Sequence, residues 1–184
     1  MYRILLVDDE INVLSALKRE ITTIPVEDLD GERPAIETFA SARAALNRIN
    51  EVPVDLVIAD YRMPEMNGVE FLSKVIEQHP DVARLILSGY TDLDGLIGAI
   101  NRVQISHFIK KPWNDFELKS AITQSLATRA LVQENLRLAH LVNEQQSSLS
   151  RQQAELLRLE EESPGITRIQ FAEDGGIVLD EDDV

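Results

Sequence analysis

The sequence lacks cysteine altogether, and its 184 residues include only three histidines, His79, His107 and His140. Without cysteine there are no disulfides, thiolate nucleophiles or cysteine-ligated metals. The scattered histidines argue against a zinc site built on imidazoles. Basic residues are also scarce, because 18 Lys and Arg stand against 32 Asp and Glu, for a net charge of −14. Phosphate contacts need clustered Lys and Arg, so this balance argues against direct nucleic-acid binding.

Long apolar runs are missing as well. The first one, residues 4–7, is short and is followed at once by acids. Nothing approaches the ~18 consecutive apolar residues of a membrane-spanning helix. We therefore expect no signal peptide, no membrane segment and a cytoplasmic location. A hydrophobic content of 44% over 184 residues is enough for one ordinary domain with an appendage.

Short apolar runs alternate with helical patterns through the first 125 or so residues. Residues 23–34, which hold two prolines and a glycine, are expected to form a long surface loop. Strand-helix alternation predicts an α/β fold in which a five-stranded parallel sheet is doubly wound, in the flavodoxin-like strand order. The expected strands are residues 2–7, 35–39, 54–59, 82–87 and 107–110. Helices are expected after each strand, the fourth around Leu93, Leu96, Ile97 and Ile100, with Ser41 and Asn114 as N-caps.

Polar residues follow the predicted strands where each strand ends. Asp8 and Asp9 follow the first strand, Asp60 the third, Ser88 the fourth and Lys111 the fifth. Open α/β sheets bind ligands at the carboxyl ends of their strands, so we expect these residues to converge. Clustered carboxylates need a cation, and carboxylates with water suit Mg²⁺. Adding an ammonium and a hydroxyl gives a receptor for a tetrahedral anion beside a carboxylate, as phosphoryl transfer onto aspartate requires.

Residues 128–162 form a second segment with a heptad pattern. Asn135 at a core position is of the kind that fixes register and strand number. A helix of this length would span roughly 50 Å, and a lone helix is poorly stabilised in water, so a homodimer is expected. The alternative is a frayed polar linker. The ten core positions, of which six are apolar, are Thr128, Leu131, Asn135, Leu138, Val142, Gln145, Leu149, Gln152, Leu156 and Leu159.

Residues 163–184 form the third expected segment. Ser163, Pro164 and Gly165 should end the helix, and the apolar pairs around residues 169–171 and 177–179 flank a turn-forming stretch. This pattern predicts a short β-hairpin followed by an acidic, solvated tail. The expected organisation is therefore 1–127 for the α/β domain, 128–162 for the helical extension and 163–184 for the hairpin and tail.

Residues 1 to about 125 resemble the receiver domain of two-component response regulators. The resemblance is carried by the acidic pair Asp8 and Asp9, by Asp60 with the Met-Pro and Gly68 that follow it, by Ser88-Gly89 and by Lys111-Pro112. Departures are Trp113, where the family more often has Phe, and the longer loop at 23–34. These elements, in this order and at these intervals, make a specific match.

The resemblance implies a role for each of these residues. Asp60 would be the phosphoacceptor, with Asp9, Asp60 and the backbone carbonyl of Arg62 as Mg²⁺ ligands and Asp8 acting largely through water. The phosphoryl oxygens would contact Ser88 and Lys111. Phe108 would be an aromatic switch; the alternative is an ordinary half-buried strand aromatic. The Lys111–Pro112 bond would be cis.

The function implied is that of a response regulator rather than an enzyme. A sensor histidine kinase or phosphotransfer protein would phosphorylate Asp60, and output would pass to a downstream protein or through dimerisation. The alternative is a pseudo-receiver scaffold that works without phosphorylation. A third interpretation, an aspartate-based phosphatase, ranks last because Arg62 occupies the position where a second acid is needed.

Overall fold

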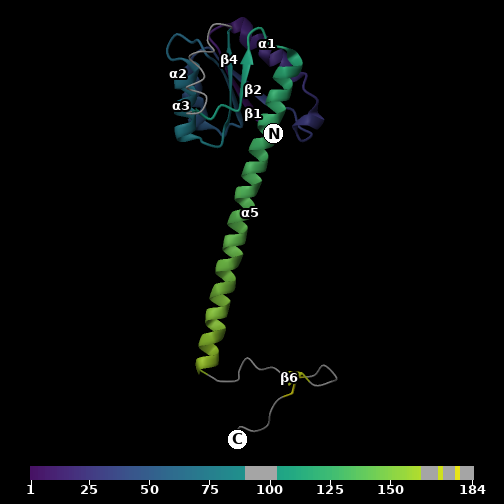
Figure 1. Cartoon of the computed structure of the whole chain (residues 1–184), viewed down its shortest axis with the longest axis vertical. Helices are drawn as coiled ribbons and strands as arrows, with labels where there is room; N and C mark the ends of the chain where they lie inside the picture. Colours follow the sequence, from purple (N-terminus) through teal and green to yellow (C-terminus); the bar gives the residue numbers. More distant parts are fainter. Residues whose placement is uncertain (90–102, 163–169, 172–176, 179–184) are drawn as a thin grey trace. The chain divides into compact units, whose positions relative to one another are not determined.

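The computed structural model describes residues 1–89, 103–162, 170–171 and 177–178 (Figure 1). The chain divides into two compact units, Met1–Gln133 and Glu134–Val184.

The first unit is built on one sheet of five parallel strands. They are β1 (Arg3–Val7), β2 (Ala35–Phe39), β3 (Leu56–Asp60), β4 (Ala83–Ser88) and β5 (His107–Lys110). Their order, β2-β1-β3-β4-β5, confirms the predicted flavodoxin-like arrangement. This order places β1 and β3 side by side in the interior of the sheet. The residues that follow these two strands therefore lie next to each other at the carboxyl end of the sheet.

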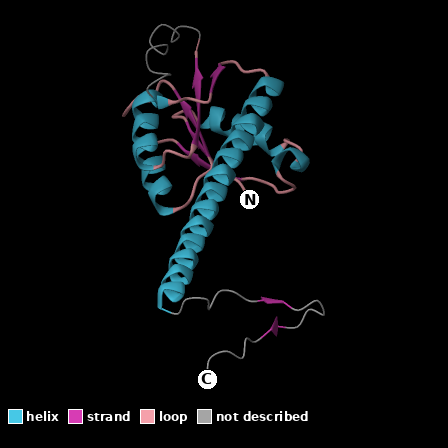
Figure 2. Ribbon diagram, turned by 60° about the horizontal axis from the view of Figure 1, so that its bottom comes forward, coloured by secondary structure: helices cyan, strands magenta, loops and turns pink. Residues whose placement is uncertain are grey.

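Helices cover both faces of the sheet (Figure 2). They are α1 (Ile11–Thr22), α2 (Ala42–Glu51), α3 (Gly68–Gln78) and α5 (Asp115–Glu162). The helix expected around Leu93, Leu96, Ile97 and Ile100 lies outside the described residues. Side chains of successive strand residues point to opposite faces, which gives the sheet two apolar clusters.

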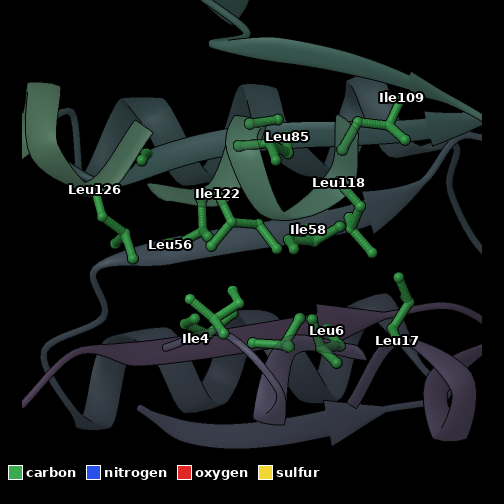
Figure 3. Packing of buried hydrophobic residues seen from close by; sticks show 14 of the residues in the cluster. Ile4, Leu6, Leu17, Leu56, Ile58, Leu85, Ile109, Leu118, Ile122 and Leu126 are labelled. Carbon is green, nitrogen blue, oxygen red and sulfur yellow. The ribbon is translucent and has the colours of Figure 1, made fainter. Parts of the chain in front are cut away.

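One cluster joins α1 and α5 to the sheet, and the other joins α2 and α3 to it. In the first, Leu118 and Ile122 of α5 pack with Ile58 of β3 (Figure 3). In the second, Phe71 of α3 packs with Val57, the neighbour of Ile58 in the same strand. The part of α5 that belongs to this core ends at Leu126, which has 1% of its surface exposed.

Side-chain caps fix where three of the helices begin. The Ser41 hydroxyl accepts a hydrogen bond from the Ala44 N–H (3.4 Å), and the Asn114 side-chain oxygen accepts from the N–H groups of residues 116 and 117. Both caps were expected from the sequence. At α3 the side chain of Asn67 accepts from the Glu70 N–H (2.9 Å), and the Glu70 carboxylate accepts from the Asn67 N–H (3.3 Å). This capping box holds the start of α3 beside the end of β3.

The stretch 23–34 lies mostly at the surface, as expected, but it has two features that a simple loop lacks. It contains a short 3-10 helix, Val26–Leu29, and it buries two apolar side chains, Ile24 and Leu29, in the cluster that includes α1 and α5. Two apolar residues five apart in a polar stretch carry no periodic signal. Their burial therefore depends on tertiary packing that the sequence pattern does not reveal.

The second unit contains the remainder of α5 and two short strands. Residues 134–162 are helical, as predicted, and residues 135–159 are largely exposed. Strands β6 (Gln170–Phe171) and β7 (Ile177–Val178) pair antiparallel, which confirms the hairpin. The expected helix break at 163–165, the turn at 172–176 and the acidic tail at 179–184 lie outside the described residues. No helix within the described ranges is long and apolar enough to cross a membrane.

Candidate functional site

The carboxyl ends of four strands meet at one edge of the sheet and carry the predicted polar residues. Asp60 ends β3 and Ser88 ends β4, while Asp8 and Lys111 directly follow β1 and β5. Backbone hydrogen bonds continue the ladder past the strands: the Lys111 N–H donates to the Ser88 carbonyl (2.7 Å), and the Asp8 N–H donates to the Phe39 carbonyl (3.1 Å). The sheet itself therefore sets the spacing of these side chains.

The Lys111 ammonium joins the two aspartates at the centre of this edge. Its Nζ lies 2.7 Å from Asp8 Oδ2 and 2.5 Å from Asp60 Oδ1. The Asp8 side chain is completely buried, and those of Asp60 and Lys111 are 8% and 20% exposed. Two carboxylates this close repel unless a cation lies between them, and Lys111 supplies that charge.

The second oxygen of each carboxylate is held by a backbone donor. Asp8 Oδ1 accepts from the Glu10 N–H and Asp60 Oδ2 accepts from the Arg62 N–H, both at 2.8 Å. Each carboxylate therefore has both oxygens engaged, one by the main chain two residues on and one by Lys111. These contacts fix the side-chain orientations, and Oδ1 of Asp60 faces the ammonium.

Burial and pairing shift two of the titrating groups. Desolvation raises the pKa of the Asp8 carboxyl, although the Lys111 ammonium and the Glu10 N–H oppose the shift. Burial by itself lowers the pKa of Lys111, but its hydrogen bonds and charge pairs with Asp60 and Asp8 outweigh this, and the net pKa is raised. The lysine is thus kept charged in a site that makes ionisation of Asp8 costly.

Gly68 allows the chain to pass close behind Asp60. A Cβ at this position would lie 2.3 Å from the Asp60 carbonyl oxygen, which is backbone and cannot move aside. The Gly68 N–H also donates to the Tyr61 carbonyl (2.8 Å). A residue without a side chain is therefore required where α3 begins, immediately beside the end of β3.

Ser88 and Phe108 lie on neighbouring strands at this edge. Ser88 is buried, and its hydroxyl donates to the Gly89 carbonyl (3.3 Å). Phe108 is half-buried on β5, pairs with Ile86 in the ladder and packs against the cluster on the α2 and α3 face. The positions agree with the expected contact and switch residues, and both roles stay predictions.

The predicted metal ligands include Asp9 and the backbone carbonyl of Arg62, besides the aspartate pair. Asp9 is exposed, whereas Asp8 beside it is buried. Within the described residues, no group of three or more His, Cys, Asp or Glu side chains is placed to hold a metal ion. Of the three predicted acids, the structure brings together Asp8 and Asp60 at one ammonium, and it leaves Asp9 exposed. Metal ligation by Asp9 and the Arg62 carbonyl stays a prediction.

This site fits a hard divalent cation in its donor chemistry. Asp8 and Asp60 both lie within reach of one cation, as their contacts with the same ammonium demonstrate. Mg²⁺ is usually bound by one or two carboxylates and keeps several waters. Two converging carboxylates with an exposed acid beside them are therefore sufficient for such an ion.

Sequence patterns did not reveal the backbone donors of Glu10 and Arg62, since every residue except proline carries an N–H. They also gave no sign that Gly68 admits the chain behind Asp60, although this glycine belongs to the motif that carries the family resemblance. The cis Lys111–Pro112 bond was expected and is confirmed.

The fold and the site together define a class: doubly wound α/β domains with an aspartate pair and a lysine at the carboxyl edge of the sheet. Residues 4–123 match the family described as the response regulator receiver domain. The chain belongs to this family, which acts in two-component signalling.

Named relatives and a solved structure agree with this assignment. The chain is 34% identical over 128 residues to the hydrogenase transcriptional regulatory protein HoxA of Cupriavidus necator, covering 70% of this chain and 25% of that protein. It is 28% identical over 155 residues to the response regulator protein TmoT of Ectopseudomonas mendocina, covering 84% and 66%. The signal receiver domain of an HD domain-containing protein from Pseudomonas fluorescens Pf-5 matches with a TM-score of 0.62 and 31% identity, covering 72% and 92%. The chain thus spans about a quarter of the HoxA length.

Proposed function

We propose that Asp60 accepts a phosphoryl group from a phosphorylated histidine of a sensor kinase or phosphotransfer protein. The observation that carries the proposal is the contact of one lysine with both Asp60 and a buried second aspartate. This arrangement concentrates positive charge beside Oδ1 of Asp60 and leaves the carboxylate held at its other oxygen. Family membership points to the same reaction.

Four residues of the candidate site have a part in this reaction. Oδ1 of Asp60 attacks the phosphorus, the P–N bond of the donor phosphohistidine breaks, and the imidazole nitrogen keeps the electron pair. The Arg62 N–H orients the nucleophile through Oδ2. The Lys111 ammonium stabilises the charge on the transferred oxygens, and the Ser88 hydroxyl turns from the Gly89 carbonyl to donate to one of them.

A bound Mg²⁺ would supply further charge neutralisation for the transferred group. Asp8 and Asp60 would hold it, together with Asp9 and the Arg62 carbonyl. The charged Lys111 contacts both Asp8 and Asp60, and it keeps these two buried carboxylates from repelling each other before the ion binds.

Output is proposed to pass to a downstream protein or through a homodimer of the helical extension. Rearrangement of Ser88 and Phe108 would carry the phosphorylation state to the surface of β5 and α5. Coupling of ~1–3 kcal/mol is sufficient for regulation. The chain is proposed to act in the cytoplasm without contacting nucleic acid itself and without an enzymatic activity of its own.

The proposal is tested by labelling with a small phosphodonor. Wild type is incubated with Mg²⁺ and acetyl phosphate, and gain of one phosphoryl group is followed by intact mass. We expect Asp60→Asn to abolish the gain. Asp81→Asn, which removes an acid 53% exposed and remote from the site, should leave it unchanged. A folded wild type that is neither phosphorylated nor bound by beryllofluoride would reject the proposal and favour the pseudo-receiver scaffold.

A further inference from the structure

The helical part of the second unit carries a stripe of exposed apolar side chains. Leu138, Val142, Leu149, Leu156 and Leu159 are 47%, 58%, 57%, 52% and 37% exposed. Their spacings of four, seven, seven and three residues follow a heptad. Because a heptad repeats every two helical turns, these side chains lie along one face of the helix.

Uncharged residues complete this stripe. The remaining heptad core positions between 135 and 159 are Asn135, Gln145 and Gln152. The charged residues of this interval all stand at other heptad positions, four of them spaced by seven residues along a different line of the helix. They are Arg137, Glu144, Arg151, Glu155 and Arg158. The stripe therefore combines apolar and amide side chains and excludes charge.

We propose that residues 135–159 pair with the same residues of a second copy of this chain as a parallel, in-register two-stranded coiled coil. This proposal rests on one part of the proposed function, the homodimer of the helical extension, and it specifies how the two helices pair. A second copy is favoured as the occupant because it presents the same stripe. A seam that contains three amides at fixed positions needs a partner with polar groups at those same positions, and an identical helix supplies them.

Parallel pairing follows from where the amides lie. In a parallel pair each core residue faces its own copy, so Asn135, Gln145 and Gln152 each meet an identical amide that both donates and accepts. The a positions of the heptad are Asn135, Val142, Leu149 and Leu156, and the d positions are Leu138, Gln145, Gln152 and Leu159. In an antiparallel pair a positions face d positions, so each glutamine faces an a position. Among the a positions between 135 and 159, only Asn135 is polar. At least one glutamine of each copy would then face an apolar residue or lose its partner altogether.

The unmatched amides decide between the two orientations. A buried amide without a hydrogen-bond partner loses its contacts with water and gains nothing in return. Polar residues at core positions are used in coiled coils to fix register and strand number at some cost in stability. The three amides therefore act as register markers, and the five apolar residues supply the burial.

Single-cysteine cross-linking tests the proposal cleanly, because the chain has no cysteine of its own. Leu138→Cys and Leu156→Cys are made separately in the full chain and oxidised under mild conditions. In the parallel pair each introduced thiol faces its own copy, so both variants should form disulfide dimers. Leu136→Cys and Leu157→Cys, whose parent residues are 64% and 68% exposed but lie off the stripe, are the matched controls. They should cross-link at least tenfold more slowly.

Other results would overturn the proposal. If disulfide forms only when the position-138 and position-156 variants are mixed, the helices run antiparallel. If wild type sediments as a monomer at tens of micromolar, with and without beryllofluoride, the stripe is covered by something other than a second copy. Asp60 labelling is measured on the same samples and does not involve the stripe. Failure of the coiled coil with normal labelling is therefore distinct from failure of the phosphoacceptor proposal.

Discussion

The two edges of the sheet each bring two aspartates to one cation, but they do so with different chemistry. At the carboxyl edge Lys111 joins Asp8 and Asp60. Near the amino ends of β3 and β4, Arg129 of α5 joins Asp55 and Asp81. Its Nη1 lies 2.6 Å from Asp55 Oδ1 and its Nη2 lies 3.9 Å from Asp81 Oδ2, while its Nε also donates to the Asp81 carbonyl (2.8 Å). The same charge pattern thus occurs twice, once in the candidate functional site and once in a structural contact between α5 and the sheet.

The choice of cation accounts for the difference. Lysine is a point charge on a flexible stem, so it neutralises two carboxylates without fixing its own geometry. Arginine presents several donors in a rigid fork, and Arg129 uses them on a side chain, a main-chain carbonyl and, at 3.2 Å, the side chain of Gln133. The lysine edge can accept a new anion or cation, whereas the arginine edge locks α5 to the loops before β3 and β4.

Removing the cation from the carboxyl edge should have the largest effect on function. In Lys111→Met the charge that stabilises the transferred group is lost, and Asp8 and Asp60 are left facing each other. We expect phosphorylation of Asp60 by acetyl phosphate to slow roughly 10²–10³-fold, as for loss of one electrostatic donor. Initial rates of labelling measure this. A rate within threefold of wild type would show that Lys111 is not part of the reaction.

Removing the cation from the amino edge should instead affect stability. Arg129→Met leaves Asp55 without its ionic partner and the Asp81 carbonyl without a donor, which should lower the free energy of unfolding by about 1–3 kcal/mol. Denaturant unfolding measures the loss. Arg137→Met, which removes only an exposed pair with Glu134, is the control and should leave the midpoint unchanged. Labelling of Asp60 should be normal in both variants, and a large loss in either would contradict the division between the edges.

Replacing one aspartate at each edge should change stability in opposite directions. Burial raises the pKa of Asp8, so its ionisation disfavours the folded state; Asp8→Asn should stabilise by roughly 0.5–1 kcal/mol at neutral pH while it impairs labelling. Asp55→Asn should destabilise, because Asp55 accepts from the Arg3 N–H (2.7 Å) and pairs with Arg129.

The pH dependence of the Asp8→Asn effect has a defined sign. Below the unfolded-state pKa of Asp8, near ~3.9, the carboxyl is protonated in both states and the two proteins should be alike. The advantage of the variant should grow as pH rises from the unfolded-state pKa to the raised folded-state pKa of Asp8, and stay constant above it. Unfolding curves at about pH 3 and pH 7 check this; a difference that is larger at the lower pH would reverse the assignment.

The carboxyl edge was largely predictable from the sequence, and the reason is topological. In a parallel sheet every strand ends at the same edge, so finding Asp8, Asp60, Ser88 and Lys111 after apolar runs was enough to bring them together. What the pattern did not indicate was that Asp9 would be exposed. Asp8 and Asp9 lie past the end of β1, at a bend of the chain, so the alternation of strand side chains does not determine which of the two is buried.

The amino edge could not be predicted in this way. Arg129 contacts Asp81 and Asp55, which lie 48 and 74 positions earlier in the sequence. No local pattern indicates that an arginine on a polar helix face makes such contacts. The same holds for Arg84, which is buried in β4 and donates to the carbonyls of Val82 and Val103. Contacts between a side chain and distant main-chain groups follow from the finished fold and leave no periodic trace in the sequence.

A conservative substitution separates the effect of charge from that of geometry at the amino edge. Arg129→Lys keeps the positive charge, but an ammonium cannot reproduce the fork that reaches Asp55 and the Asp81 carbonyl at once. Stability should therefore fall by only about 1 kcal/mol, between wild type and Arg129→Met. Chemical denaturation of the three proteins side by side gives the order. If the Arg129→Lys variant were as stable as wild type, charge alone would hold this edge, and the contrast with Lys111 would rest on burial instead of on the shape of the cation.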